Sequence, residues 1–386
     1  MNFIPYGRQD ISQADIDAVV DVLRSDFLTQ GPAIEKFEAC LADYCNAKYA
    51  VAMNSATSAL HLACLALGVG AHDIVWTSPI TFVASANSAL YCGASVDFVD
   101  IDVKTNNISI TALKYKLEIA RQANCLPAVV IPVHMAGACC DMESIFELSK
   151  EYGFKIIEDA SHAIGGSYNG GKIGASIFSD ITVFSFHPVK IITTGEGGAA
   201  LTNDKELLEK LVLLRSHGVT RDIDQMTGVS EGGWYYQQIA LGFNYRITDL
   251  QAALGLSQMS RIDPFVAKRN EIAQRYNTKL SNLPLDLPQD SIGTYSSFHL
   301  YIVKLTDQSP INRQELYDAL RSSNIGVNVH YIPVHLQPYY KEMGFSAGDF
   351  PEAERYYSRA ISLPLHPKLT LDEQDYVISR ISELLR

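Results

Sequence analysis

Short apolar, β-branched runs alternate with amphipathic stretches through the first 260 residues of the chain. These runs predict buried strands at Tyr49 to Met53, Asp73 to Trp76, Val96 to Val99, Ala128 to Pro132, Lys155 to Glu158 and Ile181 to Phe184. Helical stretches separate them, and one of these, Met142 to Tyr152, can be capped by Asp141. This alternation predicts an α/β fold with a mostly parallel sheet and helices on both faces.

The two ends of the chain show different patterns. Before the first predicted strand, Ser12 can cap a helix through about Arg24, and the sequence SDFLTQGP interrupts the pattern before a second helix begins at about Ala33. Thr29 lies in that interruption, and taken alone it is interpreted as part of a simple connector between the two helices. We predict that this entry segment belongs to a large domain over residues 1–260.

From Arg261 onward the pattern becomes that of a smaller α+β domain over residues 261–386. It predicts a helix to about Leu283, a strand at Phe298 to Leu305, a helix at Arg313 to Ser322, a strand-like VNVHYIPVH at 327–335 and a final helix opened by the capping box of Thr370 and Glu373.

Composition narrows the class of protein. The 386 residues are 47% hydrophobic and 19% charged, which is typical of a globular protein, and the formal charge of −12 disfavours nucleic acid as a partner. There is no apolar run of about 18 residues and no basic-then-apolar amino terminus, so we expect no membrane contact, no secretory signal and a cytoplasmic location. The seven cysteines lack metal-ligand spacing and are expected to be reduced, with no metal site.

The loop that follows the strand at 181–184 carries one lysine, Lys190, in the sequence FHPVKIITTGEGG. Pro188 ends the strand ladder, and the glycines let the backbone turn tightly beneath the lysine. A lysine held in a desolvated loop suits Schiff-base chemistry, because the amine must be partly neutral to attack a carbonyl. The alternative is a surface lysine on a glycine-rich turn, and the loop alone does not decide between them.

Other polar residues follow neighbouring predicted strands. Asp159 and His162 come after FKIIE, so the carboxylate is expected at the sheet edge that presents Lys190; a helix cap and a hydrogen-bonded core histidine are the alternatives. Ala56 and Thr57 open a helix whose free amides suit a phosphate, although ordinary capping by Ser55 explains them equally well. Phe82 can stack on a planar ring or belong to the core.

Taken together, the ordered motifs LTQGP, NSATSALHLA, TFVASAN, EDASHAIGG, SFHPVKIITTGEGGA, NYRITDLQAALG and VHYIPVH resemble the sugar aminotransferases of the DegT/DnrJ/EryC1/StrS family. The resemblance covers essentially the whole chain. It implies the aspartate aminotransferase fold, which is fold type I of the enzymes that use pyridoxal 5′-phosphate (PLP). The motifs IPYGRQDIS and HPVK resemble one branch of the family, which aminates UDP-4-keto-6-deoxy-N-acetyl-β-L-altrosamine with glutamate on the way to pseudaminic acid.

The resemblance also implies roles for individual residues. Lys190 matches the lysine that bonds to the cofactor and later moves the proton, and Asp159 matches the carboxylate that keeps the pyridine nitrogen protonated. His162 takes a position often filled by glutamine near the cofactor's phenolic oxygen. The other matches to cofactor contacts are Phe82 for ring stacking, Ala56, Thr57 and Ser185 for the phosphate, and Asn244 for the phosphate of the neighbouring subunit.

The match of Asn244 implies a homodimer with shared active sites, and the substrates implied are a UDP-sugar and L-glutamate. Tyr6, Thr29, Tyr331 and His335 are the residues that the matching motifs suggest for the sugar.

Three other interpretations remain. The chain could aminate another keto nucleotide sugar, 3-keto or dTDP-linked. It could belong to the dehydratase branch, which has histidine in place of the lysine, or be a silent cofactor-binding protein. Lys190 argues against the dehydratase, and Lys190 with Asp159 argues against the silent protein.

Overall fold

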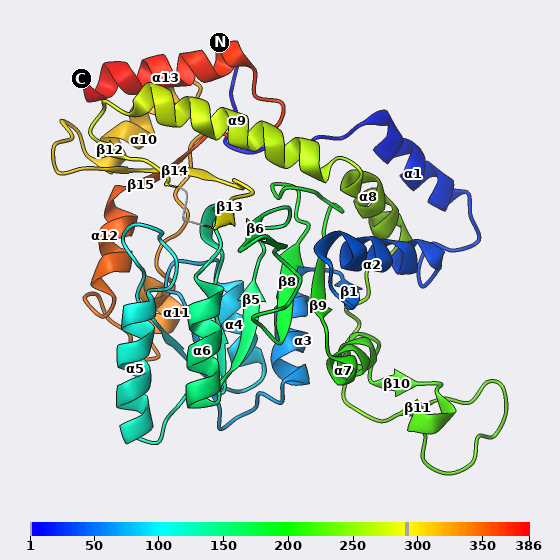
Figure 1. The fold of residues 1–386 in the computed structure, drawn as a ribbon. Helices are drawn as coiled ribbons and strands as arrows, with labels where there is room; N and C mark the ends of the chain where they lie inside the picture. The colour runs from blue at the N-terminus through cyan, green and yellow to red at the C-terminus, as the bar shows by residue number, and fades with distance from the viewer. Residues whose placement is uncertain (1, 290–292) are drawn as a thin grey trace.

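The computed structural model describes residues 2–289 and 293–386, and its central feature is a seven-stranded sheet (Figure 1). In spatial order its strands are β1 (Tyr49–Met53), β9 (Gly198–Thr202), β8 (Ile181–Ser185), β5 (Lys155–Asp159), β4 (Val129–Ile131), β2 (Ile74–Thr77) and β3 (Ser95–Phe98). Among these seven, β9 runs antiparallel to both of its neighbours, β1 and β8, and the other neighbouring pairs are parallel. The sheet is thus mixed and mostly parallel, which confirms the predicted fold class.

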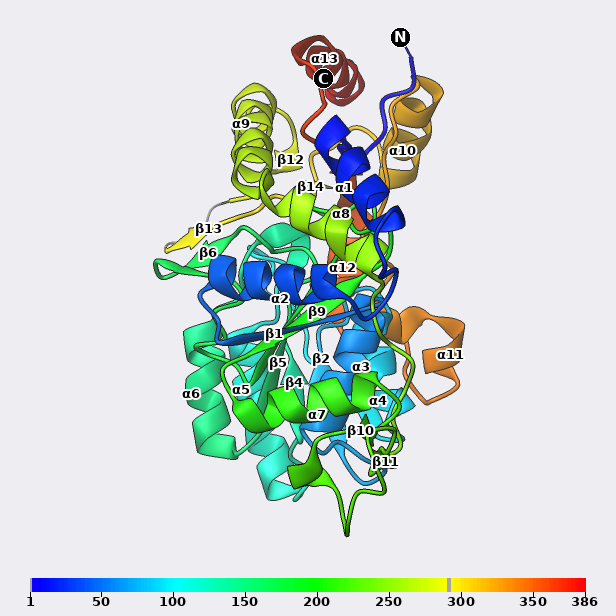
Figure 2. The same ribbon diagram turned by 90° about the vertical axis from the view of Figure 1, so that its right-hand side faces the viewer.

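Both faces of the sheet are covered by helices, as Figures 1 and 2 show. On one face lie α2 (Pro32–Cys45), α5 (Ile110–Gln122) and α6 (Met142–Tyr152), and on the other lie α3 (Ala56–Ala66), α4 (Ala84–Tyr91) and α7 (Lys205–Arg215). An apolar core lies on each face of the sheet, and successive side chains of β1 point into one and then the other. Ala50 and Ala52 lie in the core covered by α2, α5 and α6, and Val51 and Met53 lie in the core covered by α3, α4 and α7. Strands buried on both faces therefore carry near-continuous apolar sequences.

Polar caps fix the helix starts that the sequence predicts. Ser12 accepts a hydrogen bond from the Asp15 amide and opens α1 (Gln13–Leu23), and Asp141 accepts one from Ser144 at the start of α6. Thr370 and Glu373 form the predicted capping box of α13 (Leu371–Leu385).

A three-stranded antiparallel sheet lies beyond the central one, in the order β12 (Leu285–Asp286), β14 (Tyr301–Leu305) and β15 (Ala360–Leu363). It shares an apolar core with α9 (Ile262–Leu280), α10 (Arg313–Ser322) and α13. Ile4 enters this core, whereas several residues between 334 and 360 pack in a core of the large sheet. The division at residue 260 stays a prediction.

The predicted strand at 327–335 is wrong. The structure has one bridge there, between Asn328 and Ser362, after which the chain turns into the 3₁₀ helix η3 (Val334–Leu336). Pro333 cannot donate to a ladder, which is a physical reason for the pairing to end. The alternation of apolar and polar residues instead belongs to an irregular segment that presents side chains to a cavity.

The remaining elements connect or decorate these two sheets. They are α8 (Asp249–Met259), α11 (Pro338–Lys341), α12 (Pro351–Arg359), η1 (Met135–Gly137), η2 (Ile223–Gln225), β6 (Ser167–Tyr168), β7 (Gly171–Lys172), β13 (Thr294–Tyr295), β10 (Val219–Thr220) and β11 (Gln237–Gln238). The β10–β11 segment projects from the body in Figure 1. None of the described helices is both long and apolar enough to cross a bilayer.

Candidate active site

A cavity of about 900 Å³ opens at the carboxyl ends of β1, β5 and β8. Open α/β sheets place ligands at this edge, because the loops that follow parallel strands meet there. Its wall also includes residues 328–331 from the irregular segment beyond β14. Segments from both sheets thus enclose one site, and its volume is ample for a cofactor and part of a substrate.

Lys190 lies in the turn after β8 and lines the cavity. Its backbone amide donates to the His187 carbonyl at 2.9 Å, which holds the turn. Burial lowers the pKa of the Lys190 ammonium to about 8, an effect that the nearby Asp159 carboxylate partly opposes. A substantial fraction of the amine is therefore neutral near pH 8 and able to act as a nucleophile.

Asp159 is the last residue of β5, and its carboxylate is almost fully buried in the same cavity wall. Oδ2 accepts a hydrogen bond from Ser85 Oγ at 2.6 Å, and Oδ1 accepts one from the Ser161 amide at 3.1 Å. Ser85 Oγ in turn lies 2.7 Å from Thr81 Oγ1. These contacts hold a negative charge at a fixed place opposite the lysine.

The amino terminus of α3 forms another wall. Ser55 caps this helix by accepting a hydrogen bond from Ser58, which leaves the amides of Ala56 and Thr57 in the first turn, where no earlier turn can accept from them. Ser185, at the end of β8, adds a hydroxyl to the cavity wall. This set of donors suits an anion such as phosphate.

Gly198 lets the sheet approach this helix closely. It starts β9 and is paired with Met53 of β1 and with Ser185 of β8. A Cβ atom at residue 198 would lie only 2.4 Å from the Ala56 nitrogen. The absence of a side chain here therefore allows the α3 amides to lie directly at the ends of the strands.

His162 has both ring nitrogens engaged within the protein. Nδ1 accepts from the Ala136 amide at 3.3 Å, so the proton of the neutral ring sits on Nε2, which lies 3.1 Å from the Tyr331 hydroxyl oxygen. Burial, together with the charge of Lys190, lowers the pKa of His162 far below its ordinary value. His162 therefore donates to Tyr331, and the Tyr331 hydroxyl proton is left to point elsewhere in the cavity.

Two further histidines line the cavity. His330 lies next to Tyr331, and its Nδ1 is 2.8 Å from Ser362 Oγ, while burial lowers its pKa to about 3. The ring centroid of His299 is 4.4 Å from that of His162, and its buried Nδ1 has no hydrogen-bond partner among the described residues. Burial also lowers the pKa of His299, so these rings are neutral beside Lys190 and Asp159.

The structure brings most of the predicted residues to this one cavity. Its lining includes Tyr6, Ala56, Thr57, Phe82, Asp159, His162, Ser185, Lys190 and Tyr331. Phe82 is 60% exposed, so it is a free ring rather than a core residue, and its centroid lies 6.2 Å from that of Tyr331.

Three predicted residues lie outside it. Thr29 and Asn244 line a smaller cavity of about 310 Å³, and Asn54 lines both cavities. His335 is fully buried, and its Nε2 is 3.0 Å from Glu354 Oε1, so the structure does not bring it to either cavity.

Sequence reasoning missed Ser85, His299 and His330, which all line the cavity or contact its carboxylate. Ser85 lies within TFVASAN, four residues after Thr81, and this spacing at the start of a helix is a signal that could have linked the two hydroxyls. His330 precedes Tyr331 in the motif already singled out. His299 carries no local signal, because it reaches the site from the connection between β13 and β14.

Comparison with known proteins finds a family model and full-length relatives that are similar to this chain. The family model described as the DegT/DnrJ/EryC1/StrS aminotransferase family matches residues 9–382. The spore coat polysaccharide biosynthesis protein SpsC of Bacillus subtilis is 39% identical over 389 residues, covering 100% of this chain and 98% of the relative. A UDP-4-amino-4,6-dideoxy-N-acetyl-beta-L-altrosamine transaminase of Campylobacter jejuni is 37% identical over 383 residues, covering 99% and 97% of the two chains.

Solved structures of aminotransferases are also similar to this chain. Helicobacter pylori PseC, an aminotransferase involved in the biosynthesis of pseudaminic acid, superposes with a TM-score of 0.91 at 31% identity, covering 100% of this chain and 99% of the other. The PLP form of Spr1654 from Streptococcus pneumoniae gives 0.88 at 30% identity, with both chains fully covered, and the pyridoxamine phosphate (PMP) form of the same protein gives 0.89.

Proposed function

The chain belongs to the DegT/DnrJ/EryC1/StrS aminotransferase family, whose cofactor is PLP, and from this premise we propose its reaction. The proposed reaction moves an amino group from L-glutamate to the C4 keto group of a UDP-4-keto-6-deoxy-N-acetylhexosamine, in the cytoplasm and on the route to pseudaminic acid. Sugar aminotransferase activity follows from the family. The observation that carries the proposal is the placement of Lys190 and Asp159 in one cavity beside the α3 amides.

The residues present fit the cofactor. The first-turn amides of α3 and the Ser185 hydroxyl are donors for its phosphate, and Asp159 is a fixed carboxylate for its pyridine nitrogen. Phe82 is a free ring in the wall, available for stacking. When bound, PLP supplies the aldehyde that couples to an amino group and the ring that takes up negative charge.

A prediction follows for Gly198. Gly198→Ala places a Cβ 2.4 Å from the Ala56 nitrogen and should force the start of α3 away from the strands. We expect a loss of unfolding free energy of about 1–3 kcal/mol and weaker PLP binding, measured by urea unfolding and by absorbance titration. Gly70→Ala is the matched control, because nothing lies within 4 Å of its added Cβ. Wild-type PLP affinity in Gly198→Ala would show that the close approach of β9 to α3 is not required for binding of the phosphate.

Lys190 holds and moves the proton of the reaction. With PLP bound, the Lys190 amine, whose pKa is lowered to about 8, would accept a proton from the α-carbon of glutamate in the first half of the reaction. In the second half the same side chain, then protonated, would deliver a proton to C4 of the sugar. One lysine thus serves as base and as acid, and we expect ping-pong kinetics.

Asp159 and Tyr331 orient the site around this lysine. The Asp159 carboxylate is held by Ser85 and Ser161, and with PLP bound it would keep a proton on the pyridine nitrogen. His162 donates to the Tyr331 oxygen, so the Tyr331 hydroxyl is directed as a donor toward other groups in the cavity. Burial raises the pKa of Tyr331, which keeps this hydroxyl protonated.

A substrate panel tests the proposed reaction. Purified protein with glutamate is offered 4-keto and 3-keto sugars linked to UDP or dTDP, and the product is identified by NMR. We expect amination at C4 of the UDP-linked 4-keto sugar, together with formation of 2-oxoglutarate. Amination of another panel member at a higher rate would replace the proposed substrate while leaving the transaminase assignment intact.

The second candidate function is amination of another keto nucleotide sugar, 3-keto or dTDP-linked. The similarity to SpsC, named for spore coat polysaccharide, at 39% identity favours keeping it, because this value slightly exceeds the 37% of the altrosamine transaminase. Both candidates use the same Lys190 chemistry and differ only in the sugar and nucleotide contacts.

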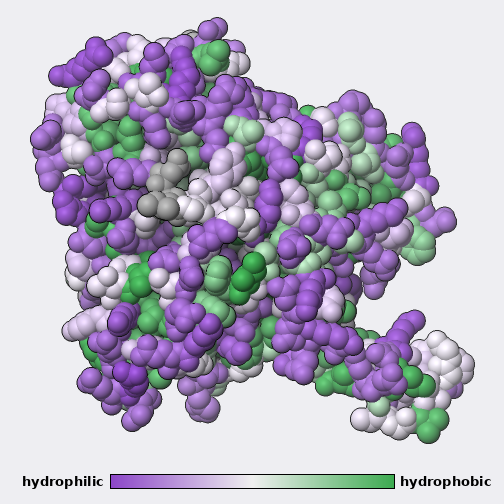
Figure 3. All heavy atoms as spheres, in the orientation of Figure 1, coloured by the Kyte–Doolittle hydropathy of each residue, from purple (hydrophilic) through white to green (hydrophobic). Residues whose placement is uncertain are grey.

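We also propose a homodimer with shared active sites. The projecting β10–β11 segment and the residues that follow it expose large apolar side chains, including Val229 at 89%, Trp234 at 72% and Leu241 at 81%. Figure 3 shows hydrophobic surface on this projection, at the lower right. Side chains of this kind are costly to leave in water, and a second copy is the proposed cover. Asn244 is exposed in the small cavity beside Asn54, where it could meet a group held by the partner.

Subunit mixing tests this arrangement. Lys190→Ala and Asn244→Asp are each expected to be inactive, the second because its added carboxylate repels the cofactor phosphate. In a mixed dimer one site receives both defects and the other receives neither, so activity should rise toward about a quarter of wild type after random exchange. Activity is followed as 2-oxoglutarate formation, and exchange by native mass spectrometry. Complete exchange without recovered activity would place Asn244 in its own subunit's site.

A further inference from the structure

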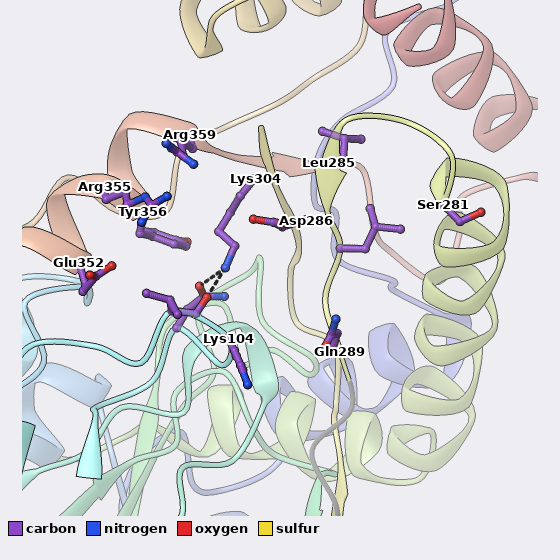
Figure 4. Close-up of a pocket in the computed structure, with 13 residues that line it drawn as sticks. Lys104, Ser281, Leu285, Asp286, Gln289, Lys304, Glu352, Arg355, Tyr356 and Arg359 are labelled. Atoms are coloured by element: carbon purple, nitrogen blue, oxygen red, sulfur yellow. Dashed lines mark hydrogen bonds between the residues drawn. The ribbon is translucent and has the colours of Figure 1, made fainter. Parts of the chain in front are cut away.

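A second cavity, of about 480 Å³, lies between α12, the small sheet and the turn at residues 103–106. Figure 4 shows its lining residues, which come from segments far apart in the sequence. Tyr356 separates it from the active site: its ring lines this cavity, while its hydroxyl donates to the His330 carbonyl at 2.5 Å. The cavity is thus distinct from the one that holds Lys190, and its volume suits a small organic molecule.

Basic side chains gather on one side of it. Lys304, on β14, donates to the Val103 carbonyl at 2.6 Å and to Asn106 Oδ1 at 2.9 Å, as the dashed lines in Figure 4 mark. Asp286 lies opposite it on β12 and favours its charged form. Burial lowers the pKa of Lys304, and a bound anion would favour its charged form.

Two arginines extend this basic wall along α12. Arg355 and Arg359 are one helical turn apart and therefore share a face of the helix. Both contact the same carboxylate, Asp307, whose side chain is 77% exposed. An ion pair so exposed to water contributes little stability, and an incoming phosphate can replace it at little cost. In a chain with a net charge of −12, such a concentration of cations is a specific feature.

Acceptors for hydroxyl groups line the same cavity. Glu352, in the first turn of α12, has a buried Oε2 atom that lacks a hydrogen-bond partner among the described residues. Asp286 adds a second carboxylate, and Leu285 with the Tyr356 ring supplies apolar surface. A buried carboxylate oxygen without a partner is costly, which favours a ligand that brings a donor to it.

We propose that this cavity is an accessory binding site for a phosphorylated sugar. The phosphate lies against Lys304 and the two arginines of α12, and sugar hydroxyls donate to Glu352 and Asp286. The guanidinium groups match the oxygens of a phosphate monoester, and carboxylates are suited to accept from hydroxyls. Neither an inorganic phosphate nor an uncharged sugar satisfies both the cationic groups and the carboxylates of this cavity.

Binding of glucose 1-phosphate to the PLP-loaded protein tests the site, because the phosphate cradle of the active site is then filled. Isothermal titration should give a dissociation constant at least about tenfold lower than those for glucose or inorganic phosphate. Lys304→Met should weaken binding by about tenfold, because it removes one charged donor and keeps a side chain of similar length. Asp307→Asn should tighten binding by about two- to threefold, because it frees both arginines.

Lys205→Met is the matched control, because Lys205 lies on α7 and is 75% exposed. This variant should bind glucose 1-phosphate as the wild type does. The opposite signs expected for Lys304→Met and Asp307→Asn separate a site effect from a loss of folding. No binding by the wild type, or equal affinity in wild type and Lys304→Met, overturns the proposal. The titration does not depend on catalysis, so its result is independent of the substrate proposed above.

Discussion

Lys190→Ala is expected to lower the conversion of glutamate to 2-oxoglutarate by about 10⁴-fold or more, because it removes both the covalent attachment and the proton carrier of the site. Among the described residues that line the cavity, three histidines also have pKa values below their ordinary range. Their buried rings are neutral, and they are held by hydrogen bonds or by packing against neighbouring rings. None of them can replace a primary amine. The variant should still bind PLP through the α3 amides and Ser185, since these donors hold the phosphate.

Three measurements check this prediction. Borohydride should trap the cofactor on the wild-type peptide that contains FHPVK, as judged by mass spectrometry, and should trap none on that peptide in Lys190→Ala. Lys190→Arg is the matched control for charge, and it should be equally inactive because a guanidinium does not deprotonate. Capture of PLP by the cofactor-free protein should accelerate as the pH rises through about 8, where the amine becomes neutral. Label on another lysine, or normal turnover in Lys190→Ala, contradicts the proposed role.

The convergence of Lys190 and Asp159 was predictable from sequence because it depends on local patterns. Each residue follows an apolar run long enough for a buried strand, and parallel strands deliver their carboxyl ends to one edge of a sheet. The structure adds that β5 and β8 are direct neighbours, which brings the two loops together. Their roles still came from the family resemblance, since a turn lysine and a strand-end aspartate have ordinary structural explanations.

The parts that escaped prediction depend on packing between distant segments. Strand β9, GAALT, is rich in small residues with weak strand preference, and pairing on both sides forms it. The segment VNVHYIPVH has the alternation of a strand, yet tertiary contacts hold it as an irregular wall: Val334 donates to the Pro79 carbonyl and His330 lies against Ser362. Alternation alone does not distinguish a strand from such a segment. His335 was suggested by the family motif, which does not show that tertiary contacts bring His330 to the cavity instead.

Asp159→Asn is expected to keep PLP bound and to lower the rate of transamination by about 10²- to 10³-fold. The amide has the size of the carboxylate, and its oxygen can still accept from the Ser161 amide. Its nitrogen would face Ser85 Oγ, which can rotate to donate to Thr81 and accept from the amide. The fold should therefore tolerate the change, while the negative charge that holds the pyridine proton is lost.

Ser85→Ala is the control that separates charge from position. It removes the hydrogen bond to Asp159 Oδ2 but leaves the carboxylate, so we expect a loss of only about tenfold, because one donor to a charged group is missing. Single-turnover absorbance with glutamate measures both variants, and thermal unfolding checks that each is folded. If Asp159→Asn turned over at the wild-type rate, the carboxylate would have no role in charge stabilisation. If Ser85→Ala lost as much activity as Asp159→Asn, the position of the carboxylate would matter as much as its charge, because the hydrogen bond from Ser85 would then be required to hold it against the ring nitrogen.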